Sequence, residues 1–157
     1  MSDAGRTLAW SRQLHQAHAA LRHQLHDVQT DLDSAQAGSG LLAHCLAFCS
    51  ALSAHHQGED GGLFAELLRI RPDLGDAVRK LTEDHRMIAG ILATVRGLAD
   101  EATRAAPERR QEIRGELGGL AAIVESHFGY EERAISDAVD GQVQDTGWTT
   151  AVFEFRT

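Results

Sequence analysis

Two short stretches of the sequence pair a histidine with a glutamate four residues later, inside otherwise apolar surroundings. HHQGED contains His55 and Glu59, and HFGYEE contains His127 and Glu131. On a helix, this spacing places each glutamate one turn beneath its histidine on the same face. Imidazole combined with carboxylate suits iron, manganese or zinc. The two stretches therefore predict a metal site.

The elements that must position these groups are four helices. Four segments show apolar residues at alternating steps of three and four, the seam of a helix packed in a bundle. They run from Leu14 to Leu32, Leu41 to Ile70, Leu74 to Ala99, and Ile113 to Ala138. The breaks between them are short: AGSG, RPDLGD and AAPERR. Short connections favour an all-α, up-down-up-down antiparallel four-helix bundle.

Each apolar stripe is interrupted by polar residues at a similar depth. The interrupting residues are His18 in the first, His55 and Glu59 in the second, His85 in the third, and His127 and Glu131 in the fourth. With a rise of 1.5 Å per residue, each place lies roughly 17–22 Å from the same end of the bundle. Four imidazoles and two carboxylates buried in one layer are costly unless cations satisfy them. A pair of metal ions is a stronger interpretation than a polar core layer.

These residues resemble the hemerythrin-like, HHE cation-binding domain family over roughly residues 10–138. The resemblance rests on HAALR, HHQGEDGGLF, LTEDH and HFGYEE. It implies two non-haem iron ions in a carboxylate-bridged centre with an oxo or hydroxo bridge, which binds dioxygen, peroxide or nitric oxide. It also implies terminal imidazole ligands and bridging carboxylates at the following positions: His18, His55, His85 and His127 as terminal ligands, and Glu59 and Glu131 as bridges.

The sequence departs from the oxygen-carrying hemerythrins at two positions. Those proteins carry a second histidine one turn after the third-helix histidine, where this chain has Ala89. They also carry an aspartate five residues after the fourth-helix histidine, whereas the acidic residue of this chain, Glu131, follows His127 by four residues. Simple oxygen carriage is therefore not the leading expectation. We expect oxygen or redox sensing, or oxygen or iron storage. The alternative is a di-iron enzyme acting on hydrogen peroxide or nitric oxide, and a zinc-loaded or metal-free structural module is a weaker third.

Several neighbours of the predicted ligands have two interpretations. His56 lies about 100° around the helix from His55; we favour a flanking or ligand-supporting position over an extra ligand that replaces the missing imidazole. For three acidic residues, ligand-orienting bonds or solvated faces are favoured over metal binding: Asp60, Asp84 and Glu132. Tyr130 fits ordinary packing slightly better than a bond to a carboxylate or an oxidant.

Small residues gather near the same layer. They are Gly58, Gly61, Gly62, Ala89 and Gly129. Close packing and room for an external ligand are equal alternatives for them. Cys45 and Cys49, one turn apart, are interpreted as small buried hydrophobic residues rather than a redox pair.

Composition narrows the remaining classes. The 157 residues fit one domain, and a formal net charge of −8 argues against nucleic acid as a partner. The apolar part from Leu41 to Ala54 is too short to span a membrane, and the first ten residues lack a signal-peptide pattern. We therefore expect a cytoplasmic protein with a bundle over residues 1–139. Residues 140–157 are expected to form a tail packed on it through Trp148, Val152, Phe153 and Phe155.

Overall fold

The computed structural model describes residues 9–33 and 40–154, which are almost entirely helical. The α-helices are α1 (Trp10–Asp33), α2 (Leu41–Gly58), α3 (Phe64–Ile70), α4 (Gly75–Ala102) and α5 (Pro107–Val139). Three short helical segments complete the order: the π-helices η2 (Glu59–Leu63) and η4 (Thr150–Glu154), and the 3₁₀-helix η3 (Pro72–Leu74). No strand occurs within the described ranges, so the prediction of an all-α chain is confirmed.

The described residues form five α-helices where the sequence predicted four. The difference lies in the second predicted segment, which η2 divides into α2 and α3. The backbone stays in the right-handed helical region at Gly58 before η2 and at Phe64 after it. The chain therefore remains helical across the division. A π-helical turn inside an α-helix is rare and occurs frequently at functional sites.

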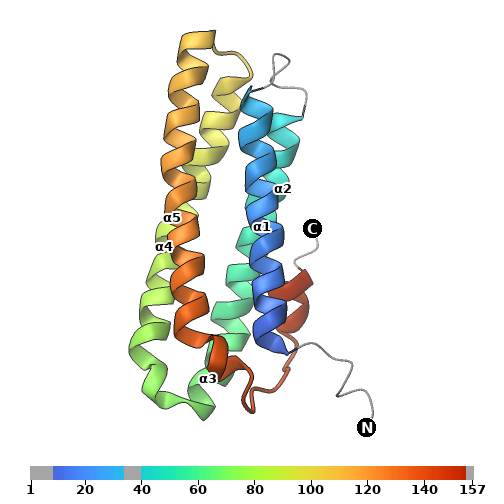
Figure 1. Ribbon diagram of the computed structural model, residues 1–157, viewed down its shortest axis with the longest axis vertical. Coiled ribbons are helices and arrows are strands. Elements are labelled where there is room, and N and C mark those ends of the chain that lie inside the picture. The colour runs from blue at the N-terminus through green and yellow to red at the C-terminus, as the bar shows by residue number, and fades with distance from the viewer. Residues whose placement is uncertain (1–8, 34–39, 155–157) are drawn as a thin grey trace.

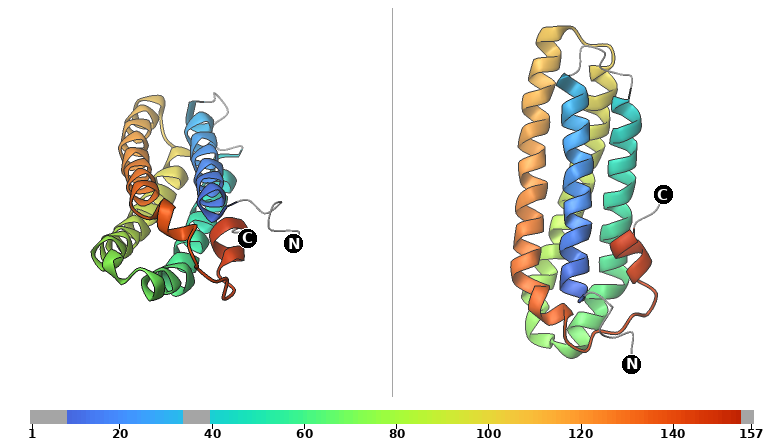
Figure 2. Two further views of the ribbon diagram at one scale, coloured as in Figure 1. Left: turned by 60° about the horizontal axis from the view of Figure 1, so that its bottom comes forward. Right: turned by 45° about the vertical axis from the view of Figure 1, so that its right-hand side comes forward.

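The long helices lie side by side along the length of the molecule (Figures 1 and 2). α1 contacts α2 and α5, and α4 contacts the same two helices. Two predicted breaks are found as expected, because Pro72 opens η3 and Pro107 opens α5, positions where the missing amide hydrogen costs nothing. The AGSG break falls mostly outside the described residues; Gly40, its last residue, precedes α2.

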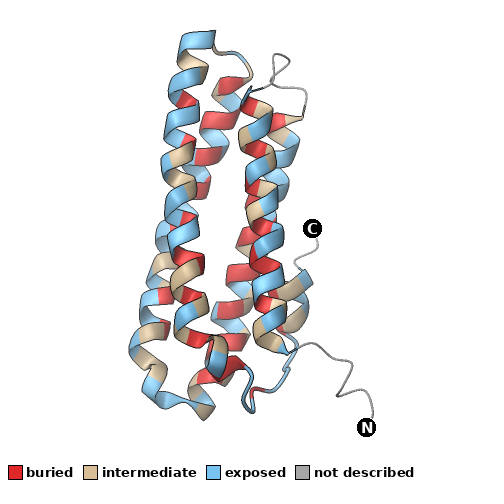
Figure 3. Ribbon diagram, viewed as in Figure 1, coloured by how far each residue is buried: buried red, intermediate tan, exposed pale blue. Residues whose placement is uncertain are grey.

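Buried residues lie along the inward faces of the helices (Figure 3). They form two apolar clusters, one including Leu21, Leu52 and Ile88, the other including Leu14 and Leu81. The charged and polar residues that are buried belong to neither cluster; they are His18, His55, His56, Glu59, His85, His127 and Glu131. A polar layer thus separates two apolar cores.

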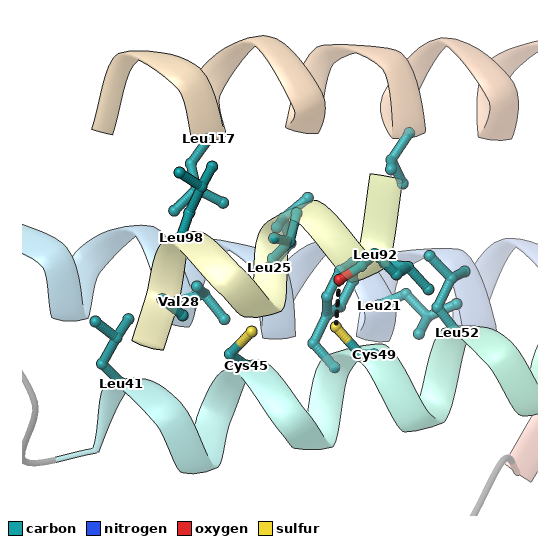
Figure 4. Close-up of a cluster of buried hydrophobic side chains, with 14 of the residues drawn as sticks. Leu21, Leu25, Val28, Leu41, Cys45, Cys49, Leu52, Leu92, Leu98 and Leu117 are labelled. Atoms are coloured by element: carbon teal, nitrogen blue, oxygen red, sulfur yellow. Dashed lines mark hydrogen bonds between the residues drawn. The ribbon is translucent and has the colours of Figure 1, made fainter. Parts of the chain in front are cut away.

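Both cysteines belong to the first apolar cluster. Cys45 and Cys49 are buried among leucines from the surrounding helices (Figure 4). The Cys49 thiol donates a weak hydrogen bond to the Leu92 carbonyl oxygen at 3.9 Å. These surroundings match the interpretation of the two residues as small buried hydrophobic groups.

After α5 the chain folds back onto the bundle. η4 contacts α1, α2 and η2, and Trp148 and Val152 are buried in the second apolar cluster. The Trp148 ring also meets the edge of Trp10, with centroids 5.0 Å apart. Phe155, expected to share this packing, lies outside the described residues. Within the described ranges, no helix has both the length and the apolar character needed to cross a membrane.

Candidate metal centre

The buried polar layer contains two adjacent groups of potential metal ligands. In the first, one ligand atom from each member lies within 4.8 Å of the others; its members are His18, His55, Glu59 and Glu131. The second meets the same distance criterion with three imidazoles, from His56, His85 and His127. The structure therefore brings together all six residues singled out in the sequence, together with His56, which was not among them.

Each carboxylate faces imidazoles of both groups. Glu59 Oε2 lies 3.3 Å from His55 Nε2, and Glu59 Oε1 lies 3.2 Å from His85 Nε2. Glu131 Oε1 lies 3.4 Å from His18 Nε2 and 3.7 Å from His127 Nε2. A carboxylate held between two sets of imidazoles has the arrangement that a bridge between two metal positions requires.

The four predicted histidine ligands each use their outer nitrogen, Nδ1, for a hydrogen bond away from the layer. His18 Nδ1 lies 2.7 Å from Glu132 Oε2, and His85 Nδ1 lies 2.8 Å from Asp60 Oδ1. A proton on Nδ1 leaves Nε2 with a free lone pair that can bind a metal. The oxygen that accepts the Nδ1 hydrogen bond fixes the orientation of the ring.

The remaining two outer bonds reach a carboxylate and a backbone carbonyl. His127 Nδ1 lies 3.2 Å from Asp84 Oδ2, and His55 Nδ1 lies 2.5 Å from the Val152 carbonyl oxygen. The acidic residues next to the predicted ligands thus form ligand-orienting bonds, as expected. The contact between His55 and Val152 was not predicted, because every residue has a backbone carbonyl and the sequence does not show which one accepts the bond.

Seven buried nitrogen and oxygen atoms of this layer have no hydrogen-bond partner in the described part of the chain. They are Nε2 of His56, His85 and His127, and both carboxylate oxygens of Glu59 and Glu131. Buried polar atoms are normally paired, because an unpaired one loses its hydration without compensation. A cluster of such atoms, all imidazole nitrogens or carboxylate oxygens, fits a bound cation.

The two buried carboxylates cannot easily be ionised together. Burial raises the pKa of Glu131 well above its usual value, and the neighbouring charge of Glu59 raises it further. Burial also opposes ionisation of Glu59, but His55, Glu131 and His85 together outweigh this and hold the pKa of Glu59 well below its usual range. Without a cation, one negative charge and one retained proton are expected in the pair.

The pKa values of the imidazoles shift in different directions because their partners differ. Burial lowers the pKa of His18, but Glu131 and Glu132 outweigh it and raise that pKa to about 9. The pKa of His85 is likewise raised to about 9, because Asp60 and Glu59 outweigh the effect of burial. In contrast, burial lowers the pKa of His127 to about 4, even though Asp84 opposes this shift.

Metal uptake should release protons and weaken as the pH falls. At pH 7, imidazoles with a pKa of about 9 carry a proton on the nitrogen that must bind the metal, as at His18 and His85. Below pH 9, metal and protons compete, so each displaced proton should cost about tenfold in affinity per pH unit. Anaerobic Fe²⁺ titrations at pH 6, 7 and 8 measure this slope. A pH-independent affinity would contradict it.

His56 does not lie on the flank of the helix, which rules out one of the two positions favoured for this residue and leaves the ligand-supporting one. Its side chain is buried, and its ring stacks on that of His85 with centroids 3.7 Å apart. Burial, together with the charge of His85, lowers the pKa of His56 well below its usual value, so the ring is neutral. A signal was present in the sequence: His56 lies seven residues after Cys49 and four after Leu52, on the broad inward stripe of the helix.

Two of the glycines match the close-packing alternative. A Cβ atom on Gly62 would lie 2.4 Å from Trp148 Cβ, and one on Gly58 would lie 2.8 Å from Val152 Cγ2. These two glycines therefore permit close packing of the C-terminal segment. Gly61 has no atom within 4 Å of such a Cβ.

Other residues near the layer have roles outside it. Lys80 Nζ lies over the Tyr130 ring, 5.0 Å from its centroid. Tyr130 also packs against the second apolar cluster. His15 Nε2 lies 3.2 Å from Ser136 Oγ on the surface, so His18, one turn later, is the inward histidine. The side chain of His23 is 75% exposed. The position of Tyr130 agrees with the packing role expected for it.

Comparison with known proteins gives one family. A family model described as the hemerythrin HHE cation binding domain matches residues 11–139. No curated protein and no solved structure shows a significant match. The matched range contains every buried imidazole and carboxylate of the layer. It ends before Val152, so the carbonyl that orients His55 lies outside the matched region.

Proposed function

The chain belongs to the hemerythrin HHE cation-binding domain family, and we propose on that basis that its buried layer binds two iron ions that take up dioxygen or a related small oxidant. Membership implies cation binding, and two groups of residues could hold a metal. The proposal adds the identity of the metal, the number of ions and the small ligand. It also includes the up-down-up-down course of the helices, which the contacts between consecutive helices support.

The observation that carries the proposal is the position of Glu59 between an imidazole of one group and an imidazole of the other. Its two oxygens lie 3.3 Å from His55 Nε2 and 3.2 Å from His85 Nε2, and neither has a hydrogen-bond partner among the described residues. A carboxylate with both oxygens aimed at different imidazole groups supports two cations better than one. The proposed terminal ligands are His18, His55, His85 and His127, with Glu59 and Glu131 as bridges.

Iron fits the proposed uptake of an oxidant better than a purely structural cation does. Imidazole with carboxylate also suits manganese and zinc, but iron, when bound, supplies the reversible oxidation that uptake of an oxidant needs. The chain itself orients the imidazoles through their Nδ1 bonds and excludes bulk water with an apolar cluster on each side of the layer. Oxygen or redox sensing, and oxygen or iron storage, are the roles that follow. We propose a cytoplasmic location for them.

A second candidate is an enzyme acting on hydrogen peroxide or nitric oxide. A surface pocket of about 220 Å³ favours it, because His56 and His85 line the pocket together with Arg86 and Ala89. A small molecule could reach the layer from this side. A binding protein and an enzyme then differ in what happens after the ligand arrives.

One set of measurements separates these functions. The purified protein is analysed for iron and zinc per chain, reduced, and followed by absorption after addition of oxygen and then peroxide. Two irons per chain with absorption bands that reverse on deoxygenation support binding. Rapid evolution of oxygen from peroxide, or consumption of nitric oxide, supports the enzyme. Fewer than two metals per chain and no such bands would exclude the di-iron proposal.

Replacing His127 by alanine should lower the metal content and remove the associated absorption bands. Its Nε2 is buried, has no partner in the described chain, and lies 3.7 Å from Glu131 Oε1. His23→Ala is the matched control, because its side chain is 75% exposed and lies outside the layer. Metal analysis and absorption spectra of both variants give the comparison. Equal losses in the two variants would contradict the site assignment.

A further inference from the structure

His56 has the surroundings of a metal ligand rather than those of a packing residue. Its Nε2 atom is buried and has no hydrogen-bond partner among the residues described. Its ring stacks on His85 at 3.7 Å and meets His127 edge-on, with centroids 5.1 Å apart. One nitrogen of each of these three rings lies within 4.8 Å of the other two. The three imidazoles therefore each place a nitrogen close enough to the other two for one cation to be shared.

We propose that His56 Nε2 is a seventh protein ligand, which completes a three-imidazole metal position with His85 and His127. This inference rests on the proposed function and deepens it. The other position then has two imidazoles, from His18 and His55. Glu59 and Glu131 contact imidazoles on both sides, so the two positions share their carboxylates and differ in the number of nitrogen donors.

The position of His56 also explains how the site can lack an imidazole at position 89. Ala89 lies one turn after His85 on α4 and has no side-chain donor, yet it lines the same pocket as His56. A third imidazole could have come from α4, but here it comes from α2. The pocket is about 220 Å³ in volume and His56 lines it, so removal of the imidazole would leave a space that a small molecule could enter from this side.

A packing role and a ligand role predict different results for two substitutions. His56→Phe retains an aromatic ring that can stack on His85 but removes the nitrogen donor. His56→Ala removes both and enlarges the pocket, so that free imidazole can enter and supply the missing nitrogen. His23→Ala, on an exposed side chain, is the control. Circular dichroism verifies that each variant is folded.

The test is an anaerobic Fe²⁺ titration of the full chain, with the number of ions bound and their affinities as readouts. We expect two ions in the wild type and in His23→Ala. In His56→Phe and His56→Ala, one ion should bind at least about tenfold more weakly, since even loss of an outer partner of a ligand costs 10–100-fold. Added imidazole should restore binding in His56→Ala but not in His56→Phe. Wild-type affinity for both ions in His56→Phe would overturn the inference.

A second measurement needs no substitution. In a crystal structure of the zinc-loaded wild type, His56 Nε2 should lie at a bonding distance of about 2.0–2.1 Å from one ion. Two ions with His56 Nε2 more than about 3 Å from both would overturn the role of His56 and leave the di-metal proposal intact. Fewer than two ions in the wild type would overturn the proposed function, and with it the inference. The two failures are therefore distinguishable.

Discussion

Replacing Glu59 by glutamine should abolish binding of the metal pair and the stabilisation that metal loading provides. Glu59 Oε1 and Oε2 face His85 and His55, one from each ligand group. Glutamine keeps the size of the side chain but removes its charge and one of its two oxygen donors, so one position loses this ligand and the other keeps only a neutral carbonyl oxygen. At a free metal concentration 1,000-fold above Kd, a ligand stabilises a protein by about 4 kcal/mol. Thermal unfolding with and without Fe²⁺ should show that this increment disappears.

The metal-free proteins provide the internal control for this prediction. Glutamine at position 59 removes one of two crowded carboxylates, so metal-free Glu59→Gln should unfold close to the wild-type temperature. Glu66→Gln makes the same chemical change on α3, where Glu66 pairs with Arg69 at 3.1 Å, and should retain both metals. Two ions bound at wild-type affinity in Glu59→Gln would show that Glu59 is not a bridge.

The depth of the polar layer could be predicted because helical geometry is regular. His18 lies between Leu14 and Leu21, and His85 lies between Leu81 and Ile88, with each pair of flanking residues in different apolar clusters. A fixed rise per residue and short connections turn such positions in the sequence into heights along the bundle. The same regularity placed each glutamate beneath its histidine.

The sequence predicted the height of the polar layer along the bundle better than the width of the inward face of each helix. The narrow seam through Leu52, His55 and Glu59 left His56 in either a flanking or a ligand-supporting position, whereas the structure buries both histidines. An inward stripe wider than 100° accommodates two adjacent residues, and a single sequence does not show which width applies. The π-helical segment η2 was also not foreseen, because the periodicity of apolar residues continues through it.

The contribution of the C-terminal segment was the least predictable feature. His55 and Val152 are 97 positions apart, and the group that meets His55 is a backbone carbonyl. Only the packing of the tail was expected, from its apolar residues. The nearby residues that indicate where the tail packs are Gly58 and Gly62, because a side chain at either position would collide with the tail. Taken alone, these glycines were equally consistent with space for a ligand.

Replacing Gly62 by alanine should therefore damage both the stability of the protein and the metal position next to His55. The new Cβ would lie 2.4 Å from Trp148 Cβ, so the buried tryptophan and the segment after it must shift. Overpacking of this kind costs about 1–3 kcal/mol. Displacement of Val152 removes the acceptor that orients His55, and loss of such an outer hydrogen bond costs about 10–100-fold in metal affinity. Chemical denaturation and Fe²⁺ titration measure the two effects.

The adjacent Gly61 separates displacement of the tail from a general effect of alanine in η2. A Cβ there has no neighbour within 4 Å, so Gly61→Ala should leave metal affinity unchanged. Because alanine is up to about 1 kcal/mol more favourable than glycine in a helix, it should not destabilise the protein. If both variants lose metal equally, the cause is the geometry of η2. If Gly62→Ala alone loses metal, the C-terminal segment holds His55 in place, and the functional unit extends beyond residues 11–139 that match the family.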